Sequence, residues 1–193
     1  MAYKTFAMLL LMAGLQTAAW AGDIDGKVTG LKGQSVVYIE AIAGKTFPAP
    51  KDHPVVDQKG LVFSPHILAI QQGTTVDFLN SDTVAHNVFW SQVGSDKKAG
   101  HNLGTWPKGE KRPFTFDKPG VVPLLCNVHP DMAGYLIVAP TPYYAETDDA
   151  GNYTIKDVPD GSYTLTVWHE GAKTQSKPVT VAGGGKSDFT LSK

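Results

Sequence analysis

Short runs of alternating apolar and polar residues, separated by glycine and proline, extend over most of the chain. No segment keeps the 3.6-residue periodicity of an amphipathic helix over ten residues or more. Val76 and Phe78 alternate with the more polar Thr75 and Asp77, as expected for a strand with one buried face. The pattern predicts an all-β protein built from many short strands, as in a β-sandwich.

The expected strands are rich in β-branched and aromatic residues and are bounded by turn residues. Glycine, which adopts positive φ, indicates turns at 118–120 and 160–161. A helical turn is expected only near 95–99. The expected strands are Ser35–Glu40, Leu61–Phe63, His66–Ile70, Thr74–Asn80, Asn87–Trp90, Arg112–Phe116, Val121–Cys126, Tyr135–Val138, Asn152–Ile155, Ser162–Trp168, Lys177–Val181 and Asp188–Leu191.

The N-terminus has the composition of a secretory signal peptide. Lys4 precedes an apolar stretch from Phe6 to Leu15, and the small-residue site Ala19-Trp20-Ala21 follows. The apolar stretch is shorter than the about 20 residues that a membrane span needs. We therefore expect residues 1–21 to be a signal peptide, and the mature protein to be periplasmic without stable membrane insertion.

Charge and cysteine content narrow the possible functions. The formal net charge is −1 with both signs interspersed, so there is no basic stripe that would bind nucleic acid. Cys126 is the only cysteine and cannot form an internal disulfide, although export usually brings paired cysteines. A lone thiol in such a compartment is buried, paired with another molecule or bound to a metal.

Cys126 belongs to a run of residues with metal-binding side chains. The run C-N-V-H-P-D-M contains Cys126, His129 and Met132, and His86 lies forty residues before the cysteine. Two histidines, one cysteine and a weak axial methionine are the ligands of a type 1, or blue, copper site. The loop does not easily supply all four ligands, so His86 is the candidate for the ligand outside it. Met132 could instead fill the core, as methionine often does.

The sequence around these residues resembles the cupredoxin family, with plastocyanin-like features and a loop spacing close to that of amicyanin. The similarity covers residues 61–139, including the blocks 73–82, 86–88 and 116–120 and the loop 126–134. It implies a Greek-key β-sandwich that binds one copper ion, Cu(I) or Cu(II), in a type 1 site. The implied ligands are the imidazoles of His86 and His129, the thiolate of Cys126 and the thioether of Met132.

The same resemblance makes two further expectations. In cupredoxins the residue after the first histidine commonly directs its backbone N–H at the cysteine sulfur, and Asn87 has that position here. Asp131 stands where related exported proteins, sometimes described as methylamine utilisation proteins, often have an aromatic residue. The docking surface is therefore expected to differ from theirs.

The two ends of the chain carry features of a second sandwich. A G-x-V-x-G segment begins at Gly26, a D-x-x-G-x-Y turn at Asp148 and a V-P-x-G-x-Y-x-L strand at Val158. Together they resemble the carboxypeptidase regulatory-like, transthyretin-type sandwich. The tail alone is small for a stable sandwich. We therefore expect residues 22–50 and 143–193 to form one split sandwich, with a cupredoxin domain at 55–141 inserted. Two consecutive domains are the simpler alternative.

These features predict a periplasmic copper protein that carries single electrons between redox partners such as a cytochrome or a dehydrogenase. No hydrolase or zinc-enzyme motif is present, so we do not expect an enzyme. The first alternative is copper binding or delivery without electron transfer, which is disfavoured because Met132 is the only methionine after residue 21. The second is a structural or adhesion module. The remaining histidines, His53, His66, His101 and His169, are expected to be solvated or structural, with His101 in a glycine-rich loop.

Overall fold

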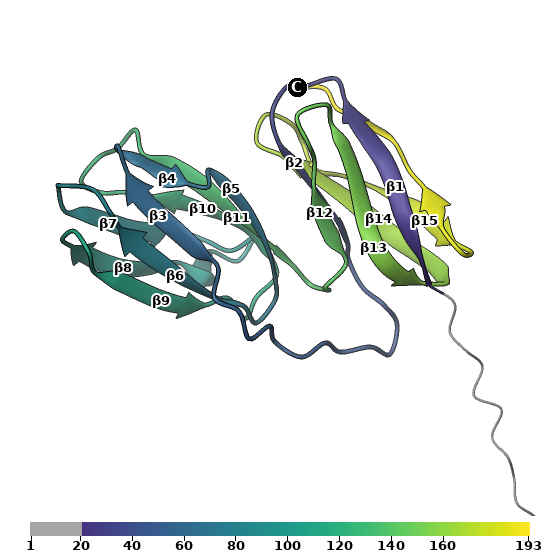
Figure 1. Cartoon of the computed structure of the whole chain (residues 1–193), viewed down its shortest axis with the longest axis horizontal. Helices are drawn as coiled ribbons and strands as arrows, with labels where there is room; N and C mark the ends of the chain where they lie inside the picture. The colour runs from purple at the N-terminus through teal and green to yellow at the C-terminus, as the bar shows by residue number, and fades with distance from the viewer. Residues whose placement is uncertain (1–20) are drawn as a thin grey trace, which may run out of the picture.

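A computed structural model of the chain describes residues 21–193, which are almost entirely β-strands and connecting turns (Figure 1). The all-β prediction is confirmed. The single helical element in this range is a 3₁₀ turn, η1 (Lys97–Ala99), capped by the Asp96 side chain, close to where a helical turn was expected. The predicted signal peptide lies outside the described residues except for Ala21. Within residues 21–193 no helix is long and apolar enough to cross a membrane.

The middle of the chain forms the first β-sandwich, from two sheets with a shared apolar core. Its parallel pairs are β5 with β11 and β3 with β6, and its other pairs are antiparallel. In spatial order, one sheet contains β5 (Ile67–Gln71), β11 (Ala133–Ala139), β10 (Gly120–Leu125), β7 (His86–Trp90) and β8 (His101–Trp106), and the other contains β4 (Val62–Ser64), β3 (Val55–Lys59), β6 (Thr75–Asn80) and β9 (Lys111–Thr115).

Strands from both ends of the chain form the second β-sandwich (Figure 1). In one sheet β1 (Ala21–Thr29) pairs with β13 (Asn152–Pro159) on one side and with β16 (Gly185–Lys186) and β17 (Phe189–Thr190) on the other. In the other sheet the order is β12 (Tyr144–Glu146), β2 (Ser35–Ile39), β14 (Gly161–His169) and β15 (Gln175–Val181). Strands β3 to β11 therefore lie, in sequence, between β2 and β12.

Strand β2 is buried on both faces, which explains its continuous apolar sequence. Val37 and Ile39 point into the core of the second sandwich, whereas Val36 belongs to an apolar cluster between the two sandwiches. Strands buried on both faces are apolar throughout rather than alternating. This burial makes the N-terminal strands an integral part of the sandwich that the C-terminal strands complete.

An apolar cluster joins the two sandwiches. It lies between the sheet of the first sandwich that has β5 at its edge and the sheet of the second sandwich that contains β2 (Figure 1). Val36 and Trp168 contact Ile67, Ala69 and Ile137 there. The Glu146 carboxylate accepts a hydrogen bond from the Ala69 backbone N–H at 2.7 Å. The interface is therefore apolar at its centre and has a charge-assisted hydrogen bond to the backbone of an edge strand.

Strand β8 corrects one expectation from the sequence. His101 was placed in a glycine-rich loop, but it begins β8, which pairs with β7 and sets Trp106 opposite His86. The strand was missed because it is mostly exposed and has little apolar alternation, and because Gly104 takes a φ of 82° within it. Strands β3, β12 and β16 were also not predicted, and β1 was expected only through the resemblance at residues 26–30.

Candidate metal centre

Two neighbouring strands bring the first two predicted ligands together. His86 begins β7, and Cys126 directly follows β10. The two strands are antiparallel, with Leu125 opposite Phe89. After Cys126 the chain turns back to begin β11 at Ala133, and the Met132 N–H donates to the His129 carbonyl at 3.0 Å. This turn carries His129 toward His86.

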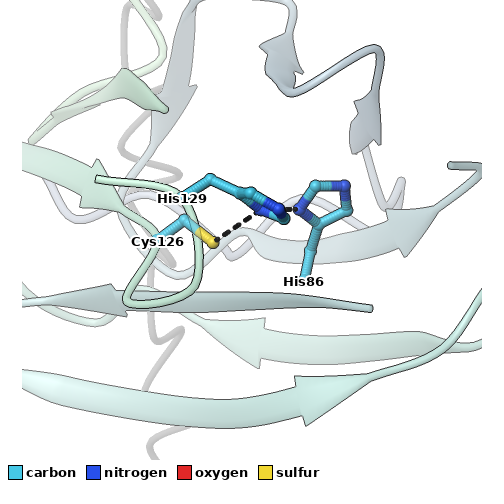
Figure 2. A group of neighbouring side chains, drawn as sticks. All are labelled: His86, Cys126 and His129. Carbon is cyan, nitrogen blue, oxygen red and sulfur yellow. Dashed lines mark hydrogen bonds between the residues drawn. The ribbon is translucent and has the colours of Figure 1, made fainter. Parts of the chain in front are cut away.

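The ligand atoms of these residues converge on one point (Figure 2). His129 Nδ1 lies 3.0 Å from His86 Nδ1 and 3.9 Å from Cys126 Sγ, and all three atoms lie within 4.8 Å of one another. His86 and Cys126 are buried, whereas His129 is partly exposed. Two imidazole nitrogens and one sulfur this close together can bind a single ion. The set fits copper, since thiolate favours Cu(I) and imidazole also suits copper.

Met132 is the fourth predicted ligand. Its side chain is 1% exposed and packs in the same apolar core cluster as Cys126. Met132 is the last residue of the ligand loop, directly before Ala133 begins β11. Its role as the axial ligand stays a prediction.

Asp82 orients the His86 ring from the side opposite the metal centre. Its carboxylate Oδ2 lies 3.1 Å from His86 Nε2. Because a carboxylate only accepts, Nε2 carries the proton and the Nδ1 lone pair is free for a metal. The hydrogen bond from His86, with further ones from the backbone N–H groups of Leu61 and Thr83, lowers the pKa of Asp82 to about 2. Sequence reasoning missed Asp82, although it lies only four residues before His86.

Asn87 connects three parts of the site. Its backbone N–H points at the Cys126 sulfur at 3.5 Å, which confirms the expectation from the resemblance. Its side-chain oxygen accepts a hydrogen bond from the Asn127 N–H at 3.2 Å. Its side-chain nitrogen donates to Asn102 Oδ1 and to the Gly104 carbonyl, both at 2.8 Å. A single buried amide therefore ties β7 to β8 and to the ligand loop.

The other histidines lie outside this centre. His53 Nδ1 is 3.6 Å from an oxygen of Asp77, and the His101 ring packs 4.7 Å from that of Phe114. His169 is buried and contacts the Lys32 carbonyl. Across residues 21–193, His86, Cys126 and His129 are the only group of three or more histidine, cysteine or acidic side chains that could bind a metal ion.

A buried centre of two histidines and one cysteine at one end of a β-sandwich defines a cupredoxin-type copper protein. Residues 51–139 match the family of copper binding proteins described as plastocyanin/azurin, and residues 132–192 match the carboxypeptidase regulatory-like domain. The chain is 30% identical to amicyanin from Paracoccus versutus over 134 residues, which are 68% of this chain and 91% of that protein. The chain therefore belongs to the plastocyanin/azurin family of copper-binding proteins.

Two solved structures are also similar. An oxidized amicyanin mutant has a TM-score of 0.41 and 26% identity, over 45% of this chain and 81% of its own. A purple cupredoxin from Nitrosopumilus maritimus has a TM-score of 0.40 and 26% identity, over 45% of this chain and 99% of its own.

Replacing Asp82 should weaken copper binding. Asp82→Ala removes the acceptor that fixes the His86 ring, and loss of such a partner typically lowers metal affinity about 10–100-fold. Asp82→Asn keeps an oxygen acceptor and should lose less. Competition with a chelator for Cu(I) measures both affinities. Equal affinities for Asp82→Ala and the unchanged protein would show that the carboxylate does not support the ligand.

Replacing Asn87 should destabilise the protein even without copper. Asn87→Ala removes the side-chain hydrogen bonds of this buried residue and leaves the Asn127 N–H without its acceptor, which should cost about 1–3 kcal/mol. Urea unfolding of the copper-free protein measures this free energy. Asn127→Ala is the matched control, because it keeps the backbone N–H that Asn87 accepts from. A loss as large in the control would contradict the bracing role of Asn87.

Proposed function

We propose that this protein is a periplasmic, mononuclear type 1 copper protein that carries single electrons between redox partners. The observation that carries the proposal is the convergence of His86 Nδ1, His129 Nδ1 and Cys126 Sγ in one largely buried centre. Copper bound there, with Met132 as the axial ligand, would supply a one-electron Cu(I)/Cu(II) couple. The similarity to amicyanin supports electron transfer, and the signal-peptide-like N-terminus supports export.

The protein's own contribution is to fix the ligands before an electron moves. Asp82 fixes the His86 ring, and the Asn87 N–H contacts the Cys126 sulfur. Such partners hold ligand orientation and tune the reduction potential. Cys126 is 3% exposed, and this burial keeps water away from its sulfur. A centre held in this way needs little rearrangement when its charge changes by one electron.

Electrons would enter and leave at His129. Of the four proposed ligands it alone is not fully buried. Val128, directly before it, is 48% exposed, and Val84, two residues before His86, is 43% exposed. The exposed Asp131 adds a negative charge to this edge. This surface suits a protein partner that presents an apolar patch around its own redox group.

Cys126→Ser should abolish the colour of the copper-loaded protein. With Cu(II) the unchanged protein should show an intense thiolate-to-copper absorption band in the visible range. The variant lacks the thiolate, so the band should disappear even if some copper remains bound. A colourless unchanged protein, or a weak band unaffected by the substitution, would contradict a type 1 site and favour copper handling without electron transfer.

A charge beside His129 should slow electron exchange between two copies of the protein. Val128→Glu places like charges face to face when two copies meet at this surface, and we expect the self-exchange rate to fall about tenfold, equivalent to about 1.4 kcal/mol. Line broadening in NMR spectra of mixed oxidation states measures the rate.

Val55→Glu is the matched control for this rate. Val55 is 46% exposed and begins β3, which runs parallel to β6. The opposite end of β6, at Asn80, is the one that contacts the turn before His86, so Val55 lies at the end of the sheet away from the site. Equal slowing by the two substitutions would show that His129 is not the point of transfer.

A further inference from the structure

The copper-ligand loop ends where β11 begins, beside β5. Ala133 begins β11 directly after Met132. His66, just before β5, binds this point twice: its Nδ1 lies 3.1 Å from the Ala133 carbonyl oxygen, and its own carbonyl accepts from the Tyr135 N–H at 2.8 Å. Between them, Gly134 passes so close that a Cβ there would lie 3.0 Å from the His66 carbonyl oxygen. His66 therefore sets the path of the chain where it leaves the ligand loop.

The second sandwich contacts the other side of the His66 ring. Glu170 directly follows β14, and its Oε2 lies 2.9 Å from His66 Nε2. Both ring nitrogens of His66 thus face acceptors, one a carbonyl and one a carboxylate. Both hydrogen bonds form together only when each nitrogen carries a proton. The Glu170 carboxylate therefore holds, from one side, the same ring that contacts Ala133 on the other.

Buried residues anchor the chain close to both partners of the His66–Glu170 pair. An exposed ion pair alone contributes little to stability, and His66 and Glu170 are both partly exposed. Two residues before Glu170, however, Trp168 is buried in the cluster between the sandwiches, with its ring 5.1 Å from that of Tyr135. Tyr135 also packs against the His66 ring at 5.7 Å. The ion pair therefore lies at the edge of a packed interface that holds the neighbouring parts of the two sandwiches together.

We infer that the second sandwich positions the copper-ligand loop, through Glu170 and His66 acting on Ala133. Both are positioning residues, because neither reaches the ligand atoms. This inference rests on the proposed function in one respect: the loop has to hold copper for its position to affect electron transfer. It assigns the carboxypeptidase regulatory-like module a role in positioning the metal site.

Hydrogen exchange of the copper-free, full-length protein tests the positioning directly. Glu170→Gln should speed amide exchange at residues 132–135 by about fivefold, as expected when a charge-assisted contact to a local segment is lost. Asp149→Asn, which removes the same charge from an exposed turn of the same sandwich, should leave these amides unchanged. Equal rates in the two variants, or faster exchange over the whole protein, would overturn the inference.

Spectroscopy of the copper-loaded protein tests the consequence for the site. Glu170→Gln should alter the relative intensities of the visible bands and the copper hyperfine splitting, and Glu170→Asp should restore them. His66→Gln should produce a similar change, and the double variant should change no further, since the two residues act in series. Additive changes, or spectra identical to that of Asp149→Asn, would overturn the inference.

The two experiments separate this inference from the proposed function. If the unchanged protein lacks a thiolate-to-copper band, the proposed function fails, and hydrogen exchange still decides whether Glu170 positions the loop. If the band is present but Glu170→Gln has no effect on exchange or spectra, the electron carrier stands and only the positioning role fails.

Discussion

The pairing of β7 with β10 is the constraint on which the rest of the copper centre depends. It joins two segments forty residues apart, so that His86 and Cys126 meet, and the turn after Cys126 then needs only a few residues to add His129. Asn87 reinforces the pairing from within by binding β8 and the ligand loop. With Nδ1 of His86 only 3.0 Å from Nδ1 of His129, and its Nε2 proton held by Asp82, the donors already face one another. The strand pairing and these hydrogen bonds together bring the donors to one point.

The convergence of His86, Cys126 and His129 could be predicted from sequence, because it depends on the spacing within one loop and on a second block beside a strand. The strands with strong apolar patterns were predicted for the same local reason, and the Asn87 N–H came from family resemblance. Asp82 and the side chain of Asn87 could not be predicted, because an exposed-looking acid or amide acquires its role only when distant strands meet. The missed β8 is similar: its place is fixed by pairing with β7 and not by its own composition.

The connections between the two sandwiches explain how a split module holds together. The chain leaves the second sandwich after β2 and returns to it before β12, and these two points are tied directly. The Ile39 N–H donates to the Tyr143 carbonyl at 3.0 Å, and the Thr141 hydroxyl donates to the Ile39 carbonyl at 2.9 Å. The two segments that connect the sandwiches are therefore held together by hydrogen bonds and form one joint. A joint of this kind, beside the cluster of Val36 and Trp168, limits how far the sandwiches can move apart.

The same geometry separates the surface that supports the loop from the surface at which we propose that electrons are exchanged. On the first sandwich the cluster is built on β5 and β11, and beside it His66 contacts Ala133, at the end of the ligand loop. His129 lies in the middle of that loop, and its exposed neighbour Val128 is not part of the cluster. A second module can thus hold one end of the loop while a redox partner approaches its centre. Because the support acts at the end of the loop, it covers none of the exposed surface around His129, and the added sandwich is compatible with the electron exchange proposed there.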